Sequence, residues 1–328
     1  MVALTFLVAS LVAPAIAAAS ALTLGPRPGQ IKNLVTFGDS YTDITLLWDG
    51  GSGPSTAWPV YAARDGHLNL NSFARTGAAC SNNITWRPWP SLFEAELPEF
   101  FAANANGSLK ALKPQDTIFT LWLGTNDIGA NALFTGNGTK GATIVDTVGC
   151  AVNFINVLYK SGWRNFLFQN MLPLDKTVLY SVDSYPNLYW TLQRNTTEWN
   201  LMMKELSTAG NEIAKLMLQL LPASTPGAHI GLFDSHGLFT DMAAHPERYL
   251  NGTAPLNTTA AIRSCVYPEG ADPLNKTLAT CTEVKGTDVD SYLWFDELHP
   301  SEQADRVVAR EIAAAINRKS SNWTTWYS

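Results

Sequence analysis

LVTFGDSYTD, residues 34–43, is an apolar run that breaks off into Gly38-Asp39-Ser40. A short apolar run rich in β-branched and aromatic residues predicts a buried strand of a parallel sheet. Gly, Asp and Ser are ordinary turn residues, so this stretch alone predicts only a strand followed by a turn. A chemical role for Ser40 therefore requires partners from elsewhere in the chain.

Similar apolar runs recur along the chain, and helical patterns separate several of them. The predicted strands are residues 33–37, 68–73, 117–123, 165–170 and 229–233. Apolar residues recur at helical intervals over 143–160 and 198–221, and Ser301 is a suitable N-cap for a last helix. This alternation predicts an α/β fold, with a central, mainly five-stranded parallel sheet between two helical layers. Segments 174–195 and 240–290 are less regular, and we expect them to decorate the sheet as loops.

The composition is that of a globular protein. The chain has 328 residues, of which 15% are charged and 46% hydrophobic. No repeat or linker divides residues 20–328, so we expect a single domain there. Residues 1–19 carry no charge and end in a run of small residues, which is typical of a secretory signal peptide. No later stretch is long and apolar enough to predict a membrane anchor.

Glycosylation motifs and cysteines also favour a secreted, extracellular protein. The chain contains eight Asn-x-Ser/Thr motifs, at Asn83, Asn106, Asn137, Asn195, Asn251, Asn257, Asn275 and Asn322. Its four cysteines allow three disulfide pairings. We favour Cys265–Cys281, because the short segment between them resembles a loop that such a bond would stabilise by about 3 kcal/mol. Cys80–Cys150 then follows by elimination.

Charge and cysteine spacing exclude several functions. The net charge is −6, and no Lys/Arg cluster offers a basic face, so a nucleic-acid partner is not expected. The cysteine spacing matches no familiar zinc site. We expect a monomer that needs no cofactor and no metal ion.

Polar turns follow the first three predicted strands. They are Gly38-Asp39-Ser40, Arg75-Thr76-Gly77-Ala78 and Gly124-Thr125-Asn126-Asp127. Turn chemistry explains each of them alone. However, ligands bind outside the carboxyl ends of parallel strands, and these turns meet at that edge of the sheet. Three such turns together favour a functional site.

A nucleophilic serine also needs a base, and the base must be oriented. Among the five histidines, His299 is the best candidate, because Asp296 precedes it by three residues in FDELHP. In such a turn the carboxylate can reach Nδ1 of the imidazole, which leaves Nε2 free for a hydroxyl proton. A capping loop explains an isolated Asp-x-x-His, but the three polar turns favour catalysis.

These segments resemble the conserved blocks of the GDSL, or SGNH, hydrolases. FGDSYTD is similar to their first block, FARTGA to the second, GTND to the third and DELHP to the last, and they occur in family order. The first block departs at Tyr41, where the family has leucine; we expect Tyr41 to pack without harm to activity. The resemblance implies a flavodoxin-like three-layer fold.

The resemblance also implies roles for individual residues. Ser40 would be the nucleophile, His299 the general base and acid, and Asp296 the carboxylate that orients it. The oxyanion hole would comprise the backbone N–H groups of Ser40 and Gly77 and the side-chain amide of Asn126. We expect Asp39 and Asp127 to shape the turns, with Tyr41, Asp43 and Thr125 in support.

The substrate is less well specified. GAACSNN and the overall layout are similar to the secreted fungal acetylesterases of carbohydrate esterase family 16, which implies acetylated hemicellulose oligosaccharides such as xylo-oligosaccharides. Tryptophans that could stack on sugars include Trp48, Trp58, Trp86 and Trp89, whereas we expect Trp122 to pack in the core. One alternative is a lipase or phospholipase of the same superfamily that accepts longer acyl chains. Another is a non-catalytic extracellular sugar-binding protein.

Overall fold

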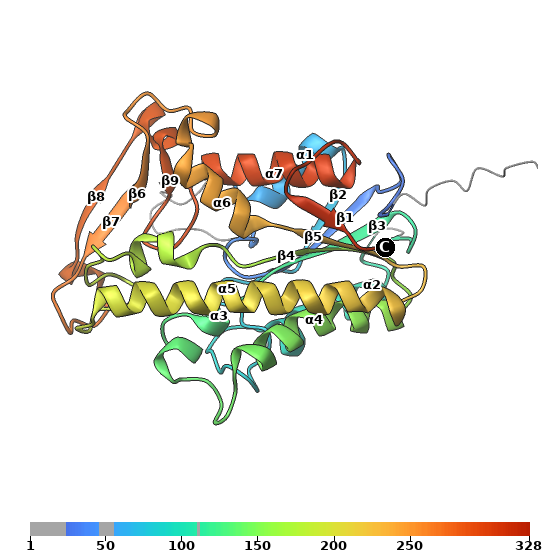
Figure 1. The fold of residues 1–328 in the computed structure, drawn as a ribbon, viewed down its shortest axis with the longest axis horizontal. Coiled ribbons are helices and arrows are strands. Elements are labelled where there is room, and N and C mark those ends of the chain that lie inside the picture. The colour runs from blue at the N-terminus through green and yellow to red at the C-terminus, as the bar shows by residue number, and fades with distance from the viewer. Residues whose placement is uncertain (1–23, 46–55, 110–111) are drawn as a thin grey trace, which may run out of the picture.

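A central mixed sheet organises the protein in the computed structural model, which describes residues 24–45, 56–109 and 112–328. Its strand order is β10-β5-β4-β3-β1-β2 (Figure 1). The strands are β1 (Asn33–Gly38), β2 (Asn69–Ser72), β3 (Thr117–Trp122), β4 (Asn165–Gln169), β5 (His229–Phe233) and β10 (Thr324–Trp326). The expected signal peptide at 1–19 and Trp48 lie outside the described residues.

The five predicted strands are confirmed, and they pair in parallel as expected. The sixth strand, β10, was not predicted; it adds to the sheet antiparallel to β5, with Trp326 opposite Gly231. β10 has only three residues, too few for an alternating pattern to stand out in the sequence. The chain thus forms the expected α/β fold with a mainly parallel sheet.

Helices cover both faces of this sheet. They are α1 (Trp58–Gly66), α2 (Leu97–Ala105), α3 (Thr125–Ile128), α4 (Ile144–Lys160), α5 (Thr196–Leu220), α6 (Ser235–Ala244) and α7 (Glu302–Ile316). Figure 1 shows α1, α6 and α7 on one side of the sheet and α2, α4 and α5 on the other. The predicted helices are confirmed to within two residues at each end, and the Ser301 side chain accepts from the Ala304 N–H as the N-cap of α7.

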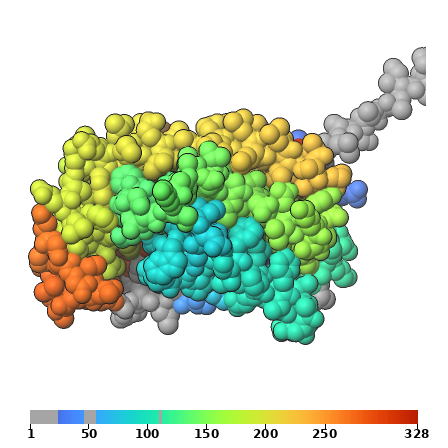
Figure 2. Space-filling model, turned by 90° about the horizontal axis from the view of Figure 1, so that it is seen from below, coloured from blue at the N-terminus to red at the C-terminus, as the bar shows by residue number. Residues whose placement is uncertain are grey.

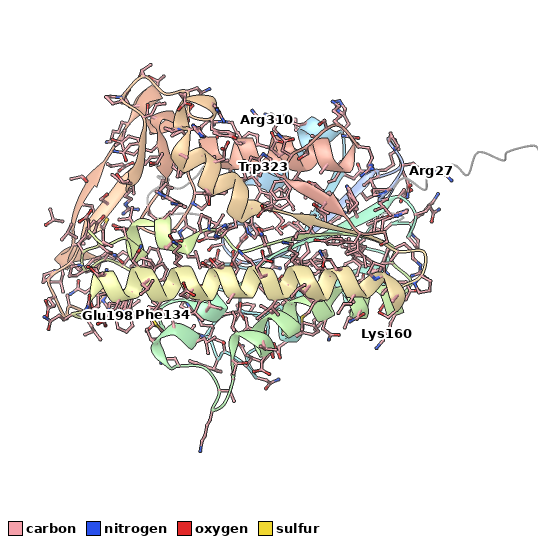
Figure 3. The ribbon with its side chains drawn as sticks, in the orientation of Figure 1. Arg27, Phe134, Lys160, Glu198, Arg310 and Trp323 are labelled. Carbon is pink, nitrogen blue, oxygen red and sulfur yellow. A yellow bond between two sulfur atoms is a disulfide. The ribbon has the colours of Figure 1, made fainter. Side chains whose placement is uncertain are left out.

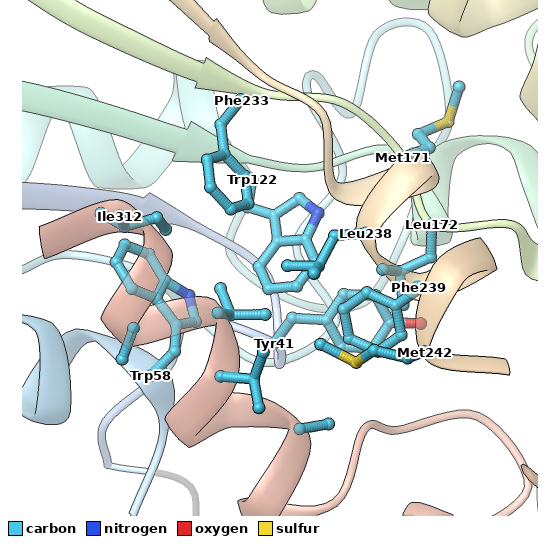
Figure 4. Close-up of a cluster of buried hydrophobic side chains, with 14 of the residues drawn as sticks. Tyr41, Trp58, Trp122, Met171, Leu172, Phe233, Leu238, Phe239, Met242 and Ile312 are labelled. Atoms are coloured by element: carbon cyan, nitrogen blue, oxygen red, sulfur yellow. The ribbon is translucent and has the colours of Figure 1, made fainter. Parts of the chain in front are cut away.

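Side chains alternate along the strands and build two hydrophobic cores. On β3, Ile118 and Trp122 face α1, α6 and α7, whereas Phe119 and Leu121 face α2, α4 and α5. Figure 4 shows the first core, where Trp122 lies among Tyr41, Phe239 and other buried side chains. The predicted packing of Trp122 is confirmed. With both faces buried, the strands leave only their ends for a site.

The helices that follow strands run back along the sheet. In Figure 3, Lys160, the last residue of α4, lies at the opposite end of the molecule from Glu198 in the first turn of α5. Both helices therefore point the same way and antiparallel to the strands. The carboxyl ends of the strands consequently share the end of the molecule where α5 begins.

The segment 240–290 is more regular than expected. β6 (Asn257–Ala261) pairs with β9 (Tyr292–Trp294), and β7 (Arg263–Val266) pairs with β8 (Thr280–Glu283) as an antiparallel hairpin. The expectation of plain loops was therefore wrong. These strands are short, and β8 is fully exposed and polar, so no alternation marked them. The hairpin is the orange surface at one end of the molecule in Figure 2.

Both favoured disulfides are present. Cys265 lies directly opposite Cys281 in the β7–β8 hairpin, and the disulfide joins the two strands there. Cys80–Cys150 joins the turn that follows β2 to α4. The second bond anchors one of the polar turns to a helix of the main body.

Candidate active site

The turn after β1 places Ser40 at the carboxyl edge of the sheet. Gly38 has φ of +136°, and a Cβ there would lie 2.1 Å from the carbonyl oxygen of Trp122, so only glycine fits. Its N–H donates to Glu96 Oε2 over 3.0 Å. Asp39 Oδ1 accepts the Tyr41 N–H over 3.0 Å. The turn is thus fixed on both sides of Ser40.

Ser40, His299 and Asp296 form one hydrogen-bonded chain. Ser40 Oγ lies 2.7 Å from His299 Nε2. On the other side of the ring, His299 Nδ1 lies 3.0 Å and 3.1 Å from the two carboxylate oxygens of Asp296. The structure therefore brings together the three predicted residues, which come from opposite ends of the chain. The arrangement suits a serine that passes its proton to a histidine.

Asp296 is buried and surrounded by donors. Its Oδ1 accepts the backbone N–H groups of Leu298 and His299 over 2.8 Å and 2.7 Å. Burial alone would raise the pKa of Asp296, but His299, the Tyr189 hydroxyl and the Leu298 N–H hold that pKa below its ordinary value. Asp296 is therefore ionised at neutral pH and can stabilise a protonated imidazole.

Tyr189 is a member of this network that sequence reasoning missed. Its hydroxyl donates to Asp296 Oδ2 over 2.6 Å and lies 3.0 Å from His299 Nδ1. Burial and the Asp296 charge raise the pKa of Tyr189 well above its ordinary value, so the hydroxyl keeps its proton. Tyr189 lies in the segment 174–195 that we expected only to decorate the sheet, and no motif marks it.

The other two turns lie against the first. Asp43 Oδ2 accepts the Thr76 N–H over 2.8 Å, and the Arg75 N–H donates to the carbonyl of Gly38 over 2.9 Å. Asn126 Nδ2 donates to the carbonyl of Ala78 over 3.1 Å, next to Gly77. The structure thus places the three predicted oxyanion-hole residues, Ser40, Gly77 and Asn126, on adjoining turns.

Two backbone N–H groups of these turns, those of Ser40 and Gly77, are available to a ligand. Within the described ranges, no acceptor is bonded to the N–H of Ser40 or of Gly77. Gly77 has φ of +79°, and a Cβ there would lie 2.7 Å from the Trp89 ring. Glycine lets the backbone take this conformation and approach the site closely.

Buried carboxyl groups accept hydrogen bonds from backbone N–H groups in and beside these turns. Asp127 Oδ1 accepts the Cys80 N–H over 2.8 Å, and Asp39 and Glu96 bind the turn after β1. Burial raises the pKa of Asp39 to about 8 and that of Asp127 to about 7. Burial also raises the pKa of Glu96 well above its ordinary value. These contacts agree with the turn-shaping role expected for Asp39 and Asp127.

Tyr41 packs as expected. It is buried, its ring centroid lies 5.3 Å from that of Trp122 and 5.5 Å from that of His299, and its hydroxyl donates to the carbonyl of Leu298. The tyrosine that departs from the family pattern therefore links the turn after β1 to the loop that carries His299.

The tryptophans differ in their availability to a ligand. Trp58 is fully buried between α1 and the sheet, so the suggestion that it stacks on sugars was wrong. Trp86 and Trp89 are 66% and 46% exposed in the loop that follows the Gly77 turn. No group of three or more His, Cys, Asp or Glu side chains that could hold a metal ion occurs in the described part of the chain. Nor is any helix there long and apolar enough to cross a membrane.

The sequence pattern of the GDSL-like lipase/acylhydrolase family matches residues 34–312. The chain belongs to this family. Membership of the family, together with the acetylesterases described next, makes the protein a carboxylic ester hydrolase.

Two curated relatives of this family member are fungal enzymes. The acetylesterase of Hypocrea jecorina is 30% identical, with 95% of this chain and 96% of the relative aligned. The acetylesterase of Thermothelomyces thermophilus is 24% identical over 87% of this chain and 88% of its own. Among solved structures, an acetylxylan esterase from Geobacillus stearothermophilus is 10% identical with a TM-score of 0.40, and the match covers 90% of this chain and 97% of that one.

Proposed function

We propose that the protein is a secreted acetylesterase that hydrolyses small acyl esters through Ser40, His299 and Asp296. Its preferred substrates would be acetylated oligosaccharides derived from hemicellulose, such as acetylated xylo-oligosaccharides. The observation that carries the proposal is the 2.7 Å contact between Ser40 Oγ and His299 Nε2, with Asp296 bonded to the other ring nitrogen.

In the first half-reaction Ser40 Oγ attacks the ester carbonyl while His299 Nε2 takes its proton. The developing oxyanion receives hydrogen bonds from the N–H groups of Ser40 and Gly77 and from Asn126 Nδ2. The protonated His299, stabilised by Asp296, then gives its proton to the departing alcohol. An acyl-enzyme remains on Ser40.

In the second half-reaction water attacks the acyl-enzyme, and His299 takes the proton of that water. The same oxyanion donors act again, and the departing Ser40 Oγ recovers its proton from His299. The site residues of this chain therefore supply the nucleophile, the acid–base group and the charge stabilisation without a cofactor.

One observation supports the acetyl group of the proposed substrate, and another supports its sugar. The 30% identical relative is an acetylesterase, and it aligns over nearly its whole length. Trp89 packs on Gly77 and is still 46% exposed, so an indole ring is available beside the site, and the exposed Trp86 lies in the same loop. Aromatic faces suit the apolar face of a sugar ring. Secretion is supported by the two disulfides, because such bonds persist in oxidising compartments.

The test is an acyl-length series of 4-nitrophenyl esters, run beside acetylated xylo-oligosaccharides with the wild type and Ser40→Ala. We expect the highest kcat/KM on acetate and release of acetate from the oligosaccharides, with neither reaction in Ser40→Ala. A preference for octanoate or longer esters would reject the acetylesterase in favour of a lipase of the same family. Hydrolysis retained by Ser40→Ala would reject the nucleophile.

The sugar contact is tested separately with Trp86→Ala. Because Trp86 is exposed and outside the hydrogen-bonded site, we expect kcat on 4-nitrophenyl acetate to stay as in the wild type. KM for the acetylated oligosaccharide should rise by about tenfold, as expected for loss of one stacking contact of about 1–1.5 kcal/mol. An unchanged KM would remove Trp86 from the substrate site.

A further inference from the structure

The side chain of Arg87, in the loop that follows β2, contacts the predicted oxyanion-hole residue Asn126. Its Nη2 donates to Asn126 Oδ1 over 3.3 Å. Its Nη1 donates to the backbone carbonyls of Ala130 and Asn131 over 3.2 Å and 3.3 Å. One guanidinium therefore binds both the amide of Asn126 and the loop that follows α3. No motif in the sequence marks this residue.

The amide of Asn126 has two possible orientations, related by a half-turn about its last side-chain bond. A guanidinium has donors and no acceptor, so only the Oδ1 side of the amide can face Arg87. The carbonyl of Ala78 can only accept, so Nδ2 must face it, and it does at 3.1 Å. Both contacts select the same orientation, in which the second hydrogen of Nδ2 is left for a substrate oxygen.

The opposite orientation would be harmful to catalysis. It would point Oδ1 at Ala78 and Nδ2 at Arg87, which gives two repulsive contacts. An amide that rotated in this way would also lose its donor at the oxyanion position. Since α3 has only four residues, the helix itself offers little to restrain the side chain.

Arg87 is itself held in place. Its guanidinium carbon lies 5.2 Å from the centroid of the Trp89 ring, and that ring packs against Gly77. Burial lowers the pKa of Arg87 from its ordinary value, and the nearby Tyr180 and Asp127 oppose this shift. A charged guanidinium bonded to Oδ1 polarises the amide, which strengthens the remaining N–H as a donor.

We propose that Arg87 is a positioning residue for ester hydrolysis, which holds the amide of Asn126 in the orientation that donates to the oxyanion. This inference rests on the proposed function of Ser40 and Asn126. Arg87 does not touch the reacting atoms; it acts through Asn126.

The test is a double-mutant cycle with Arg87→Met and Asn126→Ala, measured as kcat and KM on 4-nitrophenyl acetate. Asn126→Ala should lower kcat by at least about 100-fold, as for loss of one oxyanion donor. Arg87→Met should lower kcat by about 10- to 30-fold with KM within about twofold, because the amide then populates both orientations. In the Asn126→Ala background, Arg87→Met should change kcat by less than about twofold, since its target is gone.

Arg164→Met is the matched control. Like Arg87, Arg164 lies over an aromatic ring, that of Tyr159 at 4.4 Å, and donates to two backbone carbonyls, those of Tyr159 and Trp163. It directly precedes β4, at the opposite edge of the sheet from the site, and makes no described contact with Asn126. We expect its kcat to equal that of the wild type. Arg87→Lys keeps the charge but has no planar fork, so its kcat should lie between those of the wild type and Arg87→Met. If Arg87→Met does not fold, Arg87→Lys takes its place in the cycle.

The outcomes distinguish a failure of the role inferred for Arg87 from a failure of the proposed mechanism. If Asn126→Ala retains wild-type kcat, the oxyanion role of Asn126 is wrong and the proposed mechanism fails there. If Asn126→Ala is impaired but the two substitutions act independently on kcat, Arg87 serves only the stability of the fold and the inference is overturned. A wild-type kcat in Arg87→Met overturns it as well.

Discussion

Gly77→Ala tests how closely the oxyanion turn is packed. At φ of +79° an alanine costs about 1–2 kcal/mol relative to glycine. The new Cβ would also lie 2.7 Å from the Trp89 ring, where carbon atoms prefer about 3.5–4 Å. Ring or turn must therefore move by about 1 Å, which adds about 1–3 kcal/mol of overpacking. We expect a loss of about 2–5 kcal/mol in the free energy of unfolding, as the sum of these two costs.

Gly141→Ala is the matched control. Gly141 has φ of +87°, but no atom of the described residues lies within 4 Å of the place that the alanine methyl group would take. This variant should lose only the backbone cost of about 1–2 kcal/mol and keep wild-type kcat. The two variants are compared by denaturant unfolding and by kcat on 4-nitrophenyl acetate. Gly77→Ala should lose about 100-fold in kcat, as expected when a catalytic donor moves by about 1 Å.

Two results would refute this reasoning. Equal destabilisation of Gly77→Ala and Gly141→Ala would mean that the Trp89 ring yields freely and does not pack the turn. Wild-type kcat in a destabilised Gly77→Ala would mean that the Gly77 N–H does not bind the oxyanion. The second result would leave the contact with Trp89 intact as a purely structural feature.

Three further substitutions follow from the site. Asp296→Asn should lower kcat by about 10⁴-fold, because an amide favours the wrong imidazole tautomer; a small loss would show that Tyr189 orients His299 unaided. Tyr189→Phe removes a hydrogen bond that lowers the pKa of Asp296, so the pKa of this carboxyl should rise and the acid limb of the kcat/KM profile should move to higher pH. An unmoved limb would contradict the assignment of Tyr189 as a donor to Asp296. Burial raises the pKa of Asp127 from an ordinary 3.8 to about 7, so between these pH values the folded state holds a proton that the unfolded state has lost. The free energy of unfolding therefore falls as the pH rises from 4 to 7. Asp127→Asn should flatten that slope in denaturant titrations by up to about 1.4 kcal/mol per pH unit; an unchanged slope would show that Asp127 is ionised throughout.

The amino-acid sequence by itself determined the five parallel strands of the sheet and most of the candidate site. Strand runs such as 33–37 and 117–123 were readable because both faces are buried, so the apolar pattern is continuous and local. The site was readable for a related reason. Ser40, Gly77 and Asn126 each lie in the turn that follows a predicted strand, and Asp296 lies only three residues from His299. Parallel strands bring such turns to one edge.

Only the tertiary structure decided the features that depend on long-range contacts. β7 and β8 are short and polar, and they pair where the Cys265–Cys281 bond joins them. Trp58 looked like an available ring in the sequence but is buried, because α1 packs it against the sheet. Tyr189 lies 107 residues from Asp296, and Arg87 lies 39 residues from Asn126. Neither contact leaves a local pattern, since a tyrosine or arginine in a loop acquires a role only when folding places a carboxylate or an amide beside it.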